Sequence, residues 1–182
     1  MPLRLLSLWR NPLAEAISRD RGELSTEIGL KGPMRYLLVD RIIECKAGEN
    51  IQGIKNVALS EDFLEYHFPK NPIMPGVLLL EALIQLAGWL EASSSDFQNW
   101  FLLERVERCM FYGFAFPGDT VALELRRQAD LNVKAFSGLC SVNGKKKMSA
   151  EFSGSIIALA EIEDVEEQRR LFRFLTRAEA AK

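Results

Sequence analysis

The longest apolar stretch of the chain covers residues 77–94, in the sequence VLLLEALIQLAGWLEASS. Leucine, alanine, glutamate and glutamine dominate it, and all four residue types favour helix. Apolar positions occur almost all round the helical circumference, so we expect a buried helix of about four to five turns rather than a surface helix. The pattern therefore predicts a fold built around one central helix.

Runs of alternating and β-branched residues on both sides of this helix are typical of strands. They occupy residues 36–48, 51–59, 100–112, 120–128, 131–142 and 145–159. The pair Asn143-Gly144 separates the last two runs and predicts a tight hairpin, because both residues accept positive φ angles. About five or six strands joined mostly by short turns indicate an α+β fold, with an antiparallel sheet wrapped around the central helix.

Both ends of the chain carry further helical patterns. Within about the first 28 residues, apolar side chains recur at a spacing of about 3.6 and predict an amphipathic helix. These side chains are Leu5, Trp9, Leu13 and Ile17. The C-terminal segment predicts a second helix, either packed on the surface or docked on a partner or membrane. We divide the chain into an N-terminal helical extension (1–32), a central domain (33–158) and a C-terminal helix (159–182).

Composition and charge narrow the class of protein. The chain has 182 residues, of which 48% are hydrophobic and 26% charged, so disordered, collagen-like and disulfide-stapled classes are excluded. With 23 basic and 25 acidic residues the net charge is −2, so we expect no nucleic-acid partner. No apolar run reaches the ~18 residues of a membrane span. Cys45, Cys109 and Cys140 are odd in number and far apart, which favours a reduced, cytoplasmic compartment.

The loop before the central helix, HFPKNPIMPG at 67–76, combines three prolines with the only histidine of the chain, His67. The prolines preclude regular structure and fix how the chain enters the helix. Gly76 and Val77 stand at that entrance, where backbone N–H groups without intrahelical acceptors can bind an oxyanion. His67 is therefore a candidate catalytic residue, and a packed or surface histidine is the alternative.

Glu81 lies five residues into the predicted helix, with apolar residues on both sides. A carboxyl group in such surroundings needs a partner or a proton, and a protonated carboxyl group can act as a general acid. Gln85, four residues further on, would lie on the same helix face and could hold its orientation. The alternative is a glutamate that reaches solvent or pairs with a core arginine such as Arg105.

The run HFPKNPIMPGVLLLEA at 67–82 resembles the signature of the β-hydroxyacyl-acyl-carrier-protein dehydratases of type II fatty acid synthesis. The resemblance extends in order over about residues 33–158, includes FAFPGDTVALE at 114–124, and favours the plain dehydratase over the dehydratase-isomerase. It implies a hotdog fold. It also implies catalytic roles for His67 and Glu81, a carbonyl-polarising N–H at Gly76 beside Val77, and a supporting role for Gln85.

The same resemblance implies a reaction and its partners. Water leaves a (3R)-hydroxyacyl thioester to give the trans-2-enoyl thioester, with His67 taking the C2 proton and Glu81 protonating the 3-hydroxyl. No metal or redox cofactor is needed, because phosphopantetheine carries the substrate. The expected partners are acyl carrier protein and a second copy of the chain, in a homodimer with shared active sites or a hexamer of three dimers.

The acyl chain requires an apolar tunnel, and an acidic carrier requires basic contacts. Candidates for the tunnel, each of which could equally belong to the core, are Leu79, Leu83, Trp89, Phe114 and Phe116. Candidates for the carrier contacts are Lys70, Arg105, Arg108, Arg126, Arg127 and Lys145–Lys147. Lys70 stands where the family usually has glycine, so the backbone there should either avoid a glycine-only conformation or bear strain.

Two other functions fit the same pattern. One is a catalytically idle hotdog protein that binds acyl carrier protein or acyl-CoA, and the other is a hotdog thioesterase in which a carboxylate activates water. Retention of both His67 and Glu81 favours the dehydratase, because a binding protein needs neither group.

Overall fold

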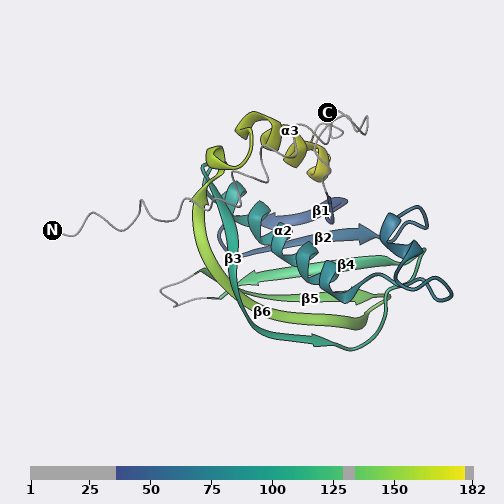
Figure 1. Ribbon diagram of the computed structural model, residues 1–182. Coiled ribbons are helices and arrows are strands. Elements are labelled where there is room, and N and C mark those ends of the chain that lie inside the picture. Colours follow the sequence, from purple (N-terminus) through teal and green to yellow (C-terminus); the bar gives the residue numbers. More distant parts are fainter. Residues whose placement is uncertain (1–35, 129–133, 179–182) are drawn as a thin grey trace, which may run out of the picture. The chain divides into compact units, whose positions relative to one another are not determined.

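A six-stranded antiparallel sheet curves around one long helix in the computed structural model of the chain (Figure 1). The structure describes residues 36–128 and 134–178, and the residues from Leu37 onward form one compact unit. The predicted N-terminal helical extension, 1–32, lies outside the described residues.

The strand order across the sheet is β1-β2-β4-β5-β6-β3. The strands are β1 (Arg41–Lys46), β2 (Asn50–Asn56), β3 (Asn99–Phe111), β4 (Thr120–Arg127), β5 (Lys134–Val142) and β6 (Lys145–Ala158). Each falls within or next to one of the six predicted runs. In β2, β4 and β5 buried side chains largely alternate with more exposed ones, so one face of the sheet covers the core.

The hairpin between β5 and β6 has the predicted two-residue turn. Asn143 has φ 49° and Gly144 has φ 74°, the positive values that a tight hairpin turn with matched strand twist requires. β5 lies at the centre of the sheet beside β4, and β6 lies between β5 and the edge strand β3.

The central helix, α2, spans Gly76–Ser94 and lies across the concave face of the sheet (Figure 1). Its fully buried side chains include Leu83, Leu86 and Leu90. By length and composition alone α2 could cross a membrane, but 56% of its apolar window is buried within the protein. This burial is that of a core helix, which confirms the predicted helix wrapped by strands.

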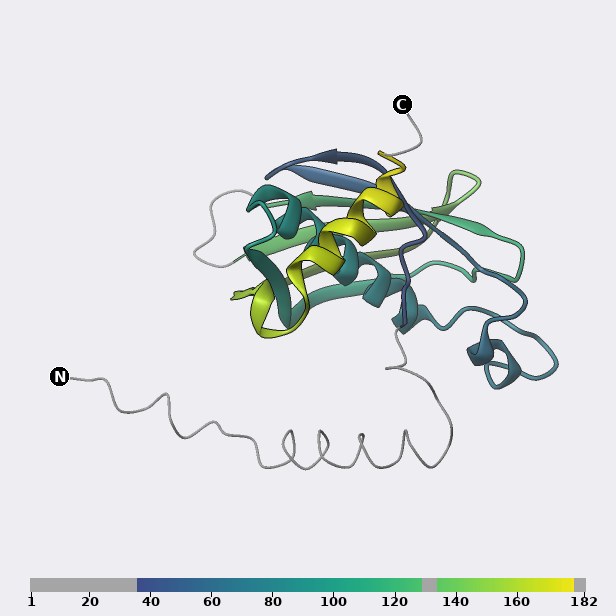
Figure 2. The same ribbon diagram turned by 90° about the horizontal axis from the view of Figure 1, so that it is seen from above.

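The C-terminal helix, α3 (Val165–Thr176), packs beside β1 and crosses over α2 (Figure 2). It begins later than residue 159, since Leu159–Glu161 form a 3₁₀ turn, η2, and Asp164 caps the helix by accepting the Glu167 N–H at 2.7 Å. Leu175 is buried and Phe172 packs against the core, whereas Phe174 stays exposed.

The two edge strands of the sheet differ in their surroundings. α3 flanks β1, whereas β3 exposes a row of apolar side chains along its length. Leu102, Val106 and Met110 recur at intervals of four residues on β3 and are 38–48% exposed. An apolar edge strand of this kind can pair with another chain.

Candidate active site

His67 follows a short 3₁₀ helix, η1 (Asp62–Glu65), and two backbone hydrogen bonds hold it there. Its N–H donates to the Phe63 carbonyl at 3.0 Å, and its carbonyl accepts the Ile73 N–H at 2.9 Å. The ring Nδ1 lies 3.1 Å from the Ile73 carbonyl oxygen. Because a carbonyl only accepts, Nδ1 carries the proton in this contact, and a neutral ring then presents the Nε2 lone pair. The ring can therefore accept a proton at Nε2.

The proline-rich loop after His67 is braced against a second turn. The Met74 N–H donates to the Ala115 carbonyl at 2.9 Å, and both Met74 and Ala115 are buried. The adjoining Pro-Gly-Asp turn places Gly118 at φ 91° and closes with a 2.9 Å bond from the Asp119 N–H to the Phe116 carbonyl. The geometry of the loop thus depends on residues about 40 positions away in the sequence.

Gln85 holds Glu81 through the hydrogen bond that the four-residue spacing predicts. The Gln85 Nε2 donates to Glu81 Oε1 at 3.0 Å, and Gln85 Oε1 accepts the backbone N–H of Leu38 at 2.9 Å. The N–H donor at Oε1 fixes which end of the amide faces Glu81. Arg105, the alternative partner, is exposed on β3. The predicted strand included residues 36–40, but β1 begins only at Arg41, and the Leu38 N–H bonds to a side chain instead of a neighbouring strand.

Gly76 is the first residue of α2, as predicted, and the Phe111 side chain lies close to it. A Cβ added there would lie 2.6 Å from the Phe111 ring, so this ring of β3 packs directly on the helix entrance. The next residue, Val77, is 66% exposed. The end of β3 therefore borders the candidate site.

Lys70 avoids the conformation reserved for glycine. Among residues 36–128 and 134–178, the non-glycine residues with positive φ are Asp96, Phe97, Asn143 and Arg177. Lys70 is exposed in a turn closed by the Asn71 N–H and the Phe68 carbonyl at 2.9 Å. Its replacement of glycine therefore needs no left-handed backbone.

The candidate tunnel residues fall into two groups. Leu79, Leu83 and Trp89 are buried in the core, and Trp89 packs edge-on against Trp100 at 5.2 Å. Phe114 and Phe116 are exposed, with their rings 6.3 Å apart in a T-shaped contact. A role for these side chains in holding an acyl chain stays a prediction.

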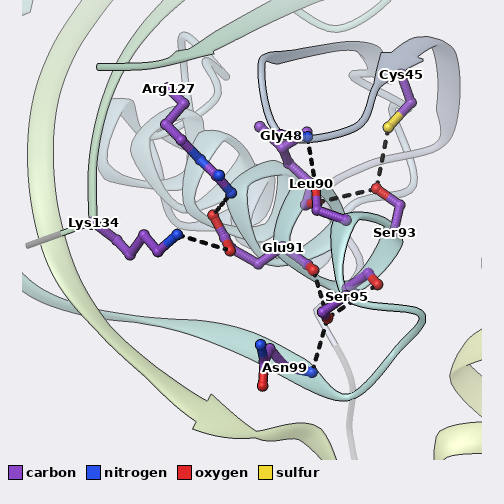
Figure 3. Close-up of polar contacts among 11 residues, drawn as sticks. Cys45, Gly48, Leu90, Glu91, Ser93, Ser95, Asn99, Arg127 and Lys134 are labelled. Atoms are coloured by element: carbon purple, nitrogen blue, oxygen red, sulfur yellow. Dashed lines mark hydrogen bonds and ion pairs between the residues drawn. The ribbon is translucent and has the colours of Figure 1, made fainter. Parts of the chain in front are cut away.

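Glu91, near the end of α2, is a buried acid that the sequence analysis did not single out. Its carboxylate forms an ion pair with Arg127 and a longer one with Lys134 at 3.8 Å (Figure 3). Arg127 thus pairs with Glu91 while its side chain stays 22% exposed, and its role as a carrier contact stays a prediction. Other candidate carrier contacts, such as Arg108 and Lys145, are exposed.

Lys55 is a second buried charge that the sequence analysis missed. Its Nζ lies 2.6 Å from Glu61 Oε1 and 3.3 Å from Asp40 Oδ1, and its side chain is only 5% exposed. The signal was present, because Lys55 occupies an inward position of β2, in phase with Ile51 and Val57. A charged residue in that phase indicates a buried ion pair.

Comparison with known proteins identifies the class to which this fold and site belong. Residues 30–151 match the FabA-like domain. A hot-dog-like protein from Thermanaerovibrio acidaminovorans shares the fold with a TM-score of 0.52 and 17% identity, over 71% of this chain and 93% of that one. The protein is thus a FabA-like domain with the hotdog fold.

Two curated relatives narrow the class further. The chain is 47% identical over 96 residues to the 3-hydroxyacyl-acyl-carrier-protein dehydratase FabZ of Thermoanaerobacter sp. (strain X514), covering 51% of this chain and 68% of the relative. It is 39% identical over 136 residues to the FabZ enzyme of Rickettsia felis, covering 72% and 94%. The chain belongs to the FabZ dehydratase family, which confirms the resemblance found in its sequence.

Proposed function

We propose that this protein dehydrates (3R)-hydroxyacyl-acyl-carrier-protein thioesters to trans-2-enoyl thioesters in fatty acid biosynthesis. The dehydratase names of its relatives support this reaction. The observation that carries the proposal is that hydrogen bonds orient both candidate catalytic side chains, one before the proline-rich loop and one on α2. His67 has its Nδ1 satisfied by Ile73, and Glu81 is held by Gln85.

In the proposed mechanism, His67 Nε2 takes the C2 proton and the C2–H electron pair forms the C2=C3 double bond. Charge develops on the thioester oxygen, and the Gly76 N–H at the helix entrance donates a hydrogen bond to it. Protonated Glu81 donates its proton to the 3-hydroxyl as the C3–O bond breaks, and water leaves. The proton on His67 then returns through solvent to Glu81. No metal or redox group enters this sequence of steps.

We infer that the active site is completed in a homodimer that forms through β3, with His67 of one subunit facing Glu81 of the other. The exposed apolar row of β3 supports this interface, because pairing two such edges would extend the sheet and cover the row. The contact between Phe111 and Gly76 supports a shared site, since it places the β3 edge beside the helix entrance.

Acyl carrier protein is the proposed substrate carrier, and the exposed basic side chains Lys70, Arg105 and Arg108 support contact with an acidic surface. A cytoplasmic location is part of the proposal. The thiols of all three cysteines are free, as expected in a reducing compartment.

An absorbance assay for the enoyl thioester tests the function, with 3-hydroxyacyl chains of several lengths on carrier protein and on coenzyme A. We expect His67→Ala and Glu81→Gln each to lower turnover at least about 100-fold, because each removes one acid or base function. Circular dichroism checks that both variants fold, and Glu65→Gln, an exposed carboxylate on η1, is the matched control with unchanged turnover.

The alternatives give different results in the same assay. Release of free thiol without enoyl thioester would identify a thioesterase. Binding of the acyl carrier without turnover would identify an idle binding protein. Full activity of either His67→Ala or Glu81→Gln would contradict the mechanism.

A further inference from the structure

The short segment Leu38–Asp40 makes hydrogen bonds to Gln85 and to Lys55, which lead toward Glu81 and toward the His67 loop of the same chain. The backbone N–H of Leu38 fixes Gln85, which in turn holds Glu81. Two residues later, Asp40 accepts a hydrogen bond from Lys55 at 3.3 Å. The segment is itself immobilised, because Leu38 and Val39 are buried in the core.

Lys55 connects this segment to the start of η1. Its Nζ bridges Asp40 and Glu61, with the shorter distance, 2.6 Å, to Glu61. Asp40 is held in turn by the Asn56 N–H, which donates to its Oδ2 at 2.5 Å. A buried ammonium with two carboxylate partners has a fixed position, and both partners must stay in place to compensate its lost hydration.

Glu61 connects Lys55 to the segment that leads to His67. It occupies the N-cap position of η1, but its side chain makes no capping hydrogen bond. The side chain instead pairs with Lys55. Two residues later, within η1, the Phe63 carbonyl accepts the His67 N–H. Asp62, Glu65 and Tyr66 are exposed, so η1 is anchored by the apolar side chains of Phe63 and Leu64 and by the Glu61 ion pair.

We propose that Lys55 is a positioning residue that sets the place of the His67 loop through its ion pair with Glu61 at the start of η1. This inference rests on the proposed function for its effect on turnover. The effect of Lys55 on the position of the His67 ring can be tested without measuring any reaction.

Kinetics of Lys55→Met provide the first test, because methionine keeps the apolar stem and removes the charge. We expect kcat to fall about 10- to 100-fold while KM changes less than about twofold, since small displacements of a catalytic group cost this much. Lys55→Arg should recover most of the loss. The matched control is Glu91→Gln, which disrupts a second buried ion pair, near the C-terminal end of α2, and should leave kcat unchanged (Figure 3).

The imidazole nitrogen resonances of His67 provide a second test that needs no activity, because the chain has a single histidine. In the wild-type protein we expect the Nδ1–H form, which the bond to Ile73 selects. In Lys55→Met the two ring nitrogens should become averaged, whereas Glu91→Gln should keep the wild-type resonances. If Lys55→Met does not fold, Glu61→Ala removes the same link from its more exposed side.

Unchanged ring resonances together with unchanged kcat in the folded Lys55 or Glu61 variants would overturn the inference. A wild-type protein without dehydratase activity would overturn the proposed function alone, and averaged resonances in the variant would still support the positioning role. A kcat loss of equal size in Glu91→Gln would show a general effect of stability and would also overturn the inference.

Discussion

At the scale of single residues, Cys140 shows how burial alone changes a titratable group. It lies on β5 with no exposed surface, and its Sγ donates to the Leu79 carbonyl at 3.8 Å. Burial, with a smaller contribution from Cys109, raises the pKa of the Cys140 thiol from 9.0 to about 12. Above pH 9 the unfolded chain loses this proton while the folded chain keeps it, so folding stability falls as pH rises.

We therefore expect the free energy of unfolding to decrease between pH 9 and 12, by up to about 1.4 kcal/mol per pH unit from this thiol. Burial also raises the pKa of Cys45 and Cys109, which adds to the decrease. Urea unfolding at a series of pH values measures the slope, and Cys140→Ala should make it shallower. An unchanged slope in Cys140→Ala would show that this thiol ionises alike in both states.

At the scale of elements, the long pairing of β3 with β6 depends on Gly154. Leu103 is its partner across the ladder, and a Cβ added at Gly154 would lie 1.9 Å from the Leu102 carbonyl oxygen. A carbonyl inside a paired strand cannot move away without disturbing the ladder, so the side chain cannot be accommodated. Gly154 of β6 thereby permits the close approach of β3, the edge strand of the proposed dimer interface.

We expect Gly154→Ala to lower the free energy of unfolding by at least about 2 kcal/mol, the range of an overpacked core. Gly113→Ala is the matched control, because its Cβ would meet nothing closer than the Lys147 side chain at 3.6 Å. Its effect should stay within about 0.5 kcal/mol. Thermal unfolding of both variants measures the difference, and equal destabilisation would argue against the backbone clash.

At the scale of the whole molecule, the proposed shared site predicts complementation between inactive chains. Random reassembly of equal amounts of His67→Ala and Glu81→Gln makes half of the dimers mixed, and each mixed dimer has one intact site of its two. Activity should recover to about one quarter of the wild-type value, provided that the assembly is a closed twofold dimer. Mass measurement of the mixed dimers establishes that subunits have exchanged. If subunits exchange but activity does not recover, each active site is built within one chain.

The sequence by itself determined the elements that arise from local patterns. The apolar run 77–94 became α2, and Asn143-Gly144 became the hairpin turn, because helix burial and positive φ angles are properties of neighbouring residues. The spacing of Glu81 and Gln85 likewise predicted their hydrogen bond, since residues four apart share a helix face.

Only the tertiary structure decided which distant groups meet. The Leu38 N–H bonds to Gln85, Lys55 joins Asp40 to Glu61, and Arg127 pairs with Glu91. Each partner lies on a different element, and the curvature of the sheet around α2 brings them together. Periodicity along the chain can show that Lys55 faces inward, but the choice of its partner depends on the packing of the whole core, because a buried charge is stable only where folding supplies its counter-charge.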